Sequence, residues 1–115
     1  LVSNSAVITC LANDINYENV FSKQIEIKGN ENDLLIALSG SGNSLNIIKA
    51  IEVANSIGMQ TIAIVGFDGG RCKKIANKFI HCRLNDMEIA EDIQMIIFNS
   101  CKQWLINNPP LQSVK

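Results

Sequence analysis

The stretch that decides the fold is DLLIALSGSGNSLNIIKAIEVA, residues 33–54, where two apolar segments flank an uncharged polar loop. The first segment, Leu34–Leu38, has the length of a strand and is apolar at every position. In the second segment, Leu45, Ile48 and Ile51 recur three residues apart, which is the spacing of one helix face. The loop Ser39–Ser44 is therefore predicted to join a buried strand to the start of a helix.

The same alternation runs through the rest of the chain. Four apolar runs of strand length are expected at Ala6–Leu11, Leu34–Leu38, Thr61–Phe67 and Phe79–Leu84. Helices are expected at about Tyr17–Ile27, Leu45–Ile57 and Met87–Ile106. Strands that are apolar on both faces are typical of a parallel sheet covered by helices on each side. The sequence thus predicts an α/β fold: a three-layer, doubly wound parallel sheet of the flavodoxin-like kind.

The ends of these helices carry their own signals. Gly58 follows the second expected helix, where a left-handed residue commonly ends a helix, and Pro109 and Pro110 cannot continue the third. The third helix is expected to bury its large apolar residues, Ile89, Ile93, Ile96, Ile97 and Trp104. One domain over residues 1–108 and a loose tail over 109–115 follow from this pattern.

Composition excludes several classes of partner. The 115 residues carry a net charge of -1 and only 5% aromatic residues, and the longest basic cluster is Arg71-Cys72-Lys73-Lys74, so no nucleic acid is expected to bind. No apolar run approaches the roughly 18 residues that cross a bilayer, so no membrane partner is expected either. The sequence indicates a cytoplasmic protein.

The cysteines and the single histidine do not suggest a metal site. Cys10, Cys72, Cys82 and Cys101 form no C-x-x-C pair, and His81 stands beside Cys82 in an expected strand, where neighbours point to opposite faces. We expect neither metal nor cofactor. The cysteines are interpreted as small buried residues with reduced thiols, and His81 as packed or solvated rather than catalytic.

The loop itself favours a phosphate. The first N–H groups of a helix have no intrahelical partners and carry partial positive charge, so a strand-to-helix loop at this position binds anions. Hydroxyl groups come from Ser39, Ser41 and Ser44, while Gly40, Gly42 and Asn43 supply backbone N–H groups. No lysine follows the glycines as in a nucleotide-binding P-loop, which favours a phosphate monoester. The alternative is an ordinary turn with a serine cap.

Three segments resemble the sugar isomerase (SIS) domain and, within it, the phosphoheptose isomerases. SGSGNS with the following Asn46, Ile47, Lys49 and Ala50 is similar to the family pattern S-x-S-G-N-S-x-N-I-x-K-A, and LANDINYENVFSKQI and IAIVGFDGG resemble its neighbouring segments. The resemblance implies a sugar phosphate ligand held by the three serines, with Asp14 near the sugar hydroxyls. It also implies a homo-oligomer, a dimer or tetramer. A local helix or turn cap is the other interpretation of Asp14.

The residues for catalysis depart from the family. Family members use a Glu on an N-terminal helix and a His on the last helix, but this sequence begins beyond the family's N-terminal helices and first strand. Asn99 aligns with the His, or Lys102 does if Gln94 is matched instead, and asparagine cannot carry a proton near neutral pH. Glu88 and Glu91, together with Asp92, remain as candidate acids, unless they only stabilise the helix dipole.

Three hypotheses follow. The chain is part of an isomerase of sedoheptulose 7-phosphate, or a non-catalytic SIS module that senses a sugar phosphate or holds a protein partner, or a generic doubly wound domain. The third explains the alternation but not SGSGNS. Because the proton carriers of the family are missing, this chain alone is expected to bind a sugar phosphate without isomerising it.

Overall fold

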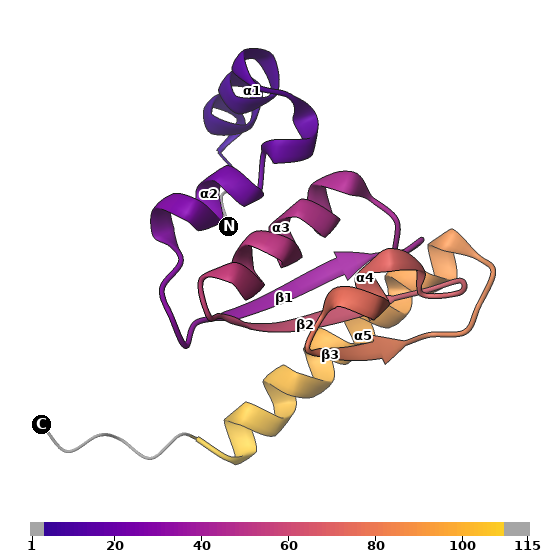
Figure 1. The fold of residues 1–115 in the computed structure, drawn as a ribbon. Coiled ribbons are helices and arrows are strands. Elements are labelled where there is room, and N and C mark those ends of the chain that lie inside the picture. Colours follow the sequence, from indigo (N-terminus) through magenta and orange to yellow (C-terminus); the bar gives the residue numbers. More distant parts are fainter. Residues whose placement is uncertain (1–3, 110–115) are drawn as a thin grey trace, which may run out of the picture.

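The computed structural model describes residues 4–109 and shows a three-stranded parallel sheet with helices on both sides (Figure 1). The strands are β1 (Leu34–Ser39), β2 (Gln60–Val65) and β3 (Lys78–His81), in the order β1-β2-β3. Leu34 of β1 pairs with Gln60 of β2, and the register continues to Ser39 and Val65. The predicted parallel α/β fold is confirmed, and β2 is the central strand.

The main core lies on one face of this sheet. Helix α3 (Leu45–Ser56) crosses that face, with α2 (Ser22–Lys28) beside it and α4 (Gly70–Ile75) next to β2 and β3. The core consists of Ile25, Leu35, Ala37, Ile48, Ala50, Ile51, Ala54, Met59, Ala63, Val65 and Cys72. Ion pairs on the surface join Glu18 to Lys49 and Glu52 to Arg71. This face is therefore closed by helices from three parts of the chain.

The opposite face is only partly covered. Helix α5 (Met87–Asn107) crosses behind the carboxyl ends of the strands, where Ala90 packs against Gly66 and Ile64 is buried (Figure 1). The outward side chains of β1, Leu34, Ile36 and Leu38, are exposed. The expectation that this strand is buried on both faces is wrong for its outer face, because α5 reaches only one end of it.

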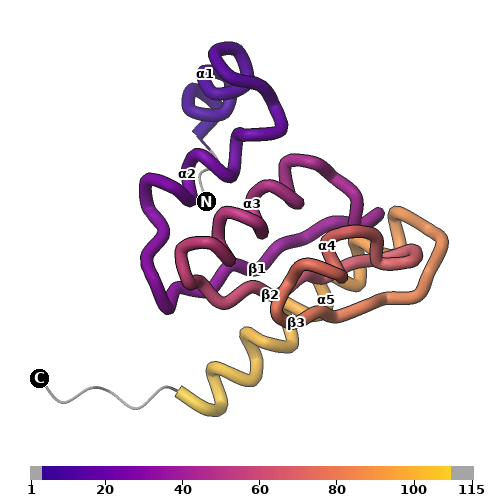
Figure 2. The backbone as a smooth tube through the Cα atoms, viewed as in Figure 1, coloured from indigo at the N-terminus to yellow at the C-terminus, as the bar shows by residue number. Residues whose placement is uncertain are grey.

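The first predicted strand, Ala6–Leu11, is wrong: these residues lie in helix α1 (Ser5–Asp14). Asn4 caps this helix by accepting a hydrogen bond from the Ala6 N–H at 2.9 Å, and none of the helix side chains is buried. A short apolar run fits a helix as well as a strand, and here the polar cap decides. Figure 2 shows α1 standing apart from the sheet.

The remaining differences are at element ends. The expected helix over Tyr17–Ile27 is divided into a 3₁₀ turn, η1 (Tyr17–Asn19), and α2. Strand β2 stops before the left-handed Phe67, β3 ends at His81, and the six-residue α4 was not predicted. Gly58 has the expected positive φ, and α5 ends at Asn107 as expected. The predicted tail lies, except for Pro109, outside the described residues.

Helix α5 buries different residues from those expected. Ala90 and Gln94 are buried, Ile93 and Ile97 are half-buried, and Ile89, Ile96 and Trp104 are exposed. The close approach of Ala90 to Gly66 admits only small side chains, and Ile89 and Ile96 lie outside this contact. None of the helices in residues 4–109 combines the length and apolar character that a bilayer crossing requires.

Core packing by α3 can be tested with two isoleucine-to-alanine changes. Ile51 is 0% exposed and Ile27 is 79% exposed, and both lie in helices. Ile51→Ala should lower the free energy of unfolding by about 2–5 kcal/mol, because it leaves a cavity in the core. Ile27→Ala is the control and should change it by less than about 0.5 kcal/mol. Urea unfolding followed by circular dichroism measures both, and equal effects would contradict this description of the core.

Candidate functional site

The loop Ser39–Ser44 leaves the carboxyl end of β1 and enters the first turn of α3, as predicted. The Gly42 N–H donates to the Ser39 hydroxyl at 3.1 Å and to the Ser39 carbonyl at 3.2 Å. Ser39 is only 5% exposed, and its hydroxyl donates to the Ser44 Oγ at 3.3 Å. The turn thus closes on itself and places two serine hydroxyls side by side.

Ser44 occupies the N-cap position of α3 but does not cap it with its side chain. The first N–H groups of this 12-residue helix consequently donate no hydrogen bond to the Ser44 hydroxyl. Helix dipoles place partial positive charge at this end. The simple capping interpretation of the loop does not account for Ser44, and the arrangement suits an anion.

Gly42 and Asn43 fasten the loop to α4. The Asn43 Oδ1 accepts a hydrogen bond from the Arg71 N–H at 3.0 Å, and the Gly42 carbonyl accepts one from the Cys72 N–H at 2.8 Å. Neither Gly42 nor Asn43 lines the cavity beside the loop. Their predicted contact with phosphate stays a prediction, and their observed contacts hold the serines in place.

A cavity of about 610 Å³ separates the loop from the first half of α5. Its walls are Leu38, Ser39, Gly40, Ser41, Ser44, Met87, Glu91, Gln94 and Met95. Met87 packs its sulfur directly over Gly40, where a Cβ atom would overlap it. The structure therefore brings the predicted serines together with one predicted acid, Glu91.

Gln94 was not predicted as a site residue, yet it contributes to the same cavity. Its side chain is only 7% exposed, and within residues 4–109 its Nε2 atom has no hydrogen-bond partner. A buried amide without a partner costs about 1–3 kcal/mol, so it points to a ligand that would accept this hydrogen bond. The signals in the sequence were a glutamine within the apolar stripe of the last helix and the alternative alignment that matches Gln94 to the family pattern.

The other candidates lie elsewhere. Asp14 is at the end of α1, where hydrogen bonds from Asn13 at 2.9 Å and from the Cys10 thiol at 3.3 Å lower the pKa of its carboxyl. Asp14, Glu88 and Asn99 do not line the cavity, and all three are exposed. The predicted roles of Asp14 in sugar binding and of Glu88 and Asn99 in catalysis stay predictions.

The cysteines differ from one another in exposure. Cys72 is buried as expected, Cys82 is half-buried, and the expectation of burial is wrong for Cys10 and Cys101. Burial raises the pKa of the Cys72 thiol, while the hydrogen bond to Asp14 raises the pKa of the Cys10 thiol. His81 is half-buried at the end of β3, in line with its interpretation as a packed residue.

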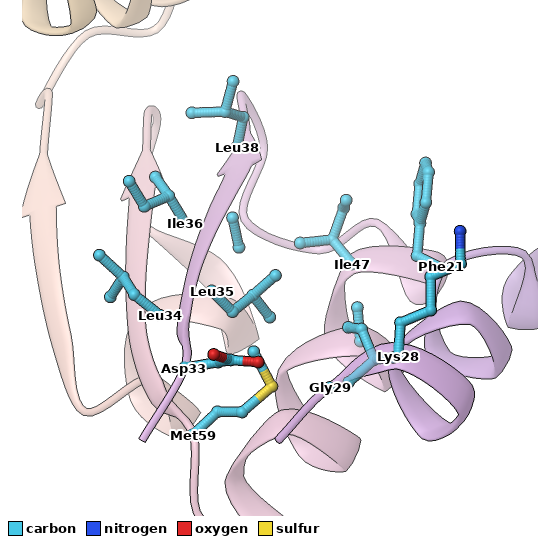
Figure 3. Close-up of a pocket in the computed structure, with 13 residues that line it drawn as sticks. Phe21, Lys28, Gly29, Asp33, Leu34, Leu35, Ile36, Leu38, Ile47 and Met59 are labelled. Atoms are coloured by element: carbon cyan, nitrogen blue, oxygen red, sulfur yellow. The ribbon is translucent and has the colours of Figure 1, made fainter. Parts of the chain in front are cut away.

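A second cavity, of about 680 Å³, runs along the free edge of β1 beside α2 and α3 (Figure 3). Phe21, Ile47 and Leu35 lie on its helix side, and Lys28 and Asp33 are its charged residues. This cavity is mostly apolar and lacks a set of converging polar groups. The serine loop and its cavity therefore form the candidate site.

Fold and loop together define an α/β domain with a serine- and glycine-rich turn between its first strand and the following helix. A family model described as "SIS domain" matches residues 1–66, more than half of the sequence. The chain belongs to the SIS domain family, which confirms the resemblance noted from the loop.

Named relatives and solved structures agree with this assignment. The chain is 35% identical over 99 residues to a phosphoheptose isomerase from Helicobacter pylori, covering 86% of this chain and 52% of the relative. It is 41% identical over 95 residues to one from Vibrio vulnificus, covering 83% and 49%. The structure of a phosphoheptose isomerase from Francisella tularensis matches with a TM-score of 0.80 and 30% identity, over 88% of this chain and 55% of that one. The chain spans about half the length of these relatives.

Thiol reactivity tests how tightly the loop closes over α4. At pH 8, iodoacetamide should modify Cys101 fastest and Cys10 more slowly, because thiolate is the reacting form and the raised pKa of Cys10 lowers its thiolate fraction. Cys72 should stay unmodified in the folded protein. Mass spectrometry of peptides measures all three, with urea-unfolded protein as the control. Modification of Cys72 at the rate of Cys101 would contradict the closed loop.

Proposed function

We propose that this chain binds a sugar phosphate in the cavity between the serine loop and α5. The observation that carries the proposal is the buried Gln94, which lines the same cavity as Ser39, Ser41 and Ser44 and whose Nε2 has no hydrogen-bond partner among the described residues. A loop alone could be a turn. Here the serine hydroxyls of the loop and the Gln94 amide of α5 line one cavity from opposite sides. Together they supply convergent hydrogen-bond donors for an oxygen-rich ligand.

The two walls suit different parts of such a ligand. The phosphate would lie at the serines and the first turn of α3, because hydroxyls and helix N–H groups favour negative charge. The sugar would lie toward α5, where Gln94 can donate to an oxygen and the Glu91 carboxylate can accept from hydroxyls. The names of the relatives support a heptose phosphate, and sedoheptulose 7-phosphate is the ligand we propose.

We propose that binding does not lead to isomerisation by this chain alone. Isomerisation of a sugar needs groups that remove and return protons beside the carbonyl. Among Glu88, Glu91 and Asn99, only Glu91 lines the cavity, and Lys102 lies eight residues beyond Gln94 on an exposed part of α5. An incomplete isomerase and a non-catalytic sensing module would both bind the sugar phosphate in this way. They differ in whether the complete protein isomerises it.

The second half of α5 supports a homo-oligomer as a further proposal. The helix face that contains Ala90 and Gln94 continues through Ile97, Cys101 and Leu105 at spacings of three and four residues. Figure 1 shows the second half of α5 extending beyond the sheet, and there Leu105 is 52% and the neighbouring Trp104 62% exposed. Only Lys102 is charged among residues 96–107, so two copies could pack these faces together without charge repulsion.

Cytoplasmic location is also a proposal. All four cysteines fall within the described residues, and none of them is in a disulfide. Free thiols, two of them exposed, are typical of a reducing compartment.

Replacement of the serine hydroxyls tests the binding proposal. Ser41→Ala with Ser44→Ala should weaken binding of sedoheptulose 7-phosphate by about 1–3 kcal/mol, because the phosphate loses two donors. Ser56→Ala with Ser100→Ala is the matched control, since both serines are exposed on helices away from the loop. Titration calorimetry measures affinity, and a coupled assay on the same samples measures turnover. Equal affinity of the wild type and the loop variant would show that the loop is a turn that does not bind the phosphate. Isomerisation by the wild type well above the rate in buffer would contradict the proposal that this chain binds the sugar phosphate without isomerising it.

Introduction of negative charge on the apolar face of α5 tests self-association. Trp104→Asp with Leu105→Asp should convert a dimer or tetramer into a monomer, because two buried carboxylates would lack partners. Gln103→Asp adds a charge on the opposite side of the same helix and should leave the assembly unchanged. Light scattering after size-exclusion chromatography measures the mass of each. A monomeric wild type at micromolar concentration would overturn this proposal.

A further inference from the structure

His81 holds the backbone of the turn that follows β2. Its Nε2 lies 2.9 Å from the Phe67 carbonyl oxygen, and its Nδ1 lies 3.2 Å from the Lys73 Nζ. A carbonyl can only accept a hydrogen bond and an ammonium group can only donate one. These two contacts suit a ring that carries a proton on Nε2, facing the carbonyl, and a lone pair on Nδ1, facing Lys73.

The residue that His81 holds has an unfavourable backbone conformation. Phe67 has φ of 47°, in the left-handed region that residues other than glycine, asparagine and aspartate seldom adopt. Its N–H donates to the Leu84 carbonyl at 3.0 Å, while its own carbonyl accepts from His81. Such a conformation persists only when its surroundings fix it, and here hydrogen bonds fix both sides of the residue.

This turn supports the serine loop directly. The Gly66 N–H donates to the Gly40 carbonyl at 2.8 Å, and the Gly69 carbonyl lies against the Cα atom of Gly42. Two further hydrogen bonds, from the Arg71 and Cys72 N–H groups, reach Asn43 and Gly42. A shift of the Phe67 backbone would therefore move the surface on which the loop rests.

We propose that His81 is a positioning residue for the anion loop: by donating to the Phe67 carbonyl it holds the turn at residues 66–70 in the conformation that orients Ser39, Ser41 and Ser44. The inference rests on the proposed function, because it concerns the same cavity. Lys73 fixes the ring from the α4 side, and its Nζ also lies 5.2 Å from the centre of the Phe79 ring. His81 itself does not line the cavity and takes no part in ligand contact.

Two substitutions of His81 separate positioning from general stability. His81→Leu removes the donor and should weaken binding of sedoheptulose 7-phosphate about fivefold, which is the usual effect of one lost hydrogen bond. His81→Gln keeps an N–H donor at similar reach and should stay within about twofold of wild type. Thr61→Val is the control: Thr61 is buried at the other end of β2 and hydrogen-bonds Asn55, so its loss should lower the melting temperature without changing affinity.

Calorimetry and thermal unfolding on the same four proteins give the decisive outcomes. Weakened binding in His81→Leu with recovery in His81→Gln supports the inference. Unchanged affinity in His81→Leu, with a lower melting temperature only, overturns it while the loss in the Ser41 and Ser44 variant still supports the proposed function. A wild type that binds nothing overturns both. Should His81→Leu not fold, the ring ¹⁵N spectrum of wild type decides: a proton on Nδ1 instead of Nε2 at pH 8 contradicts the geometry.

Discussion

The candidate site depends on the contact between two backbone turns that leave no room for a side chain. Gly42 has φ of 71°, and a Cβ atom on it would overlap the Gly69 carbonyl, while one on Gly70 would overlap Gly42. Because the turns meet through backbone, hydrogen bonds from Gly66, Arg71 and Cys72 can reach the loop. This contact connects the ends of β1 and β2 and fixes the direction in which the serine hydroxyls point.

The sequence predicted the elements for which the spacing of apolar residues and the residues that end helices indicate the same structure. An all-apolar run, a helical spacing of isoleucines and Gly58 located β1 and α3 within a residue or two. The segment Ala6–Leu11 failed because its apolar residues fit either element, and only the Asn4 cap, a local hydrogen bond, favours the helix. Helix α4 was missed because six residues, three of them basic, show no period.

The site was predictable on one side only. All loop residues are adjacent in sequence, so their composition already indicated an anion site at a strand-to-helix junction. The opposite wall comes from Met87, Glu91 and Gln94, and its position depends on how closely α5 approaches the sheet. That distance is set by Ala90 against Gly66, a contact between small residues that hydrophobicity does not reveal. Large isoleucines were expected at the interface, and the polar Gln94 is buried there instead.

The proposed binding and the proposed chemistry depend on different parts of this chain. The hydrogen bonds that hold the loop join residues between Ser39 and Cys72, and α5 adds the packing of Met87 over Gly40. Candidates for proton transfer lie on α5, whose first half forms the cavity wall and whose second half exposes Trp104, Leu105 and Ile106. In the proposed oligomer, a second copy packed on that half would also affect the helix that positions Glu91 and Gln94. In the proposed function the loop therefore binds the phosphate in a single copy, whereas the arrangement of acids and amides around the sugar depends on how α5 is packed.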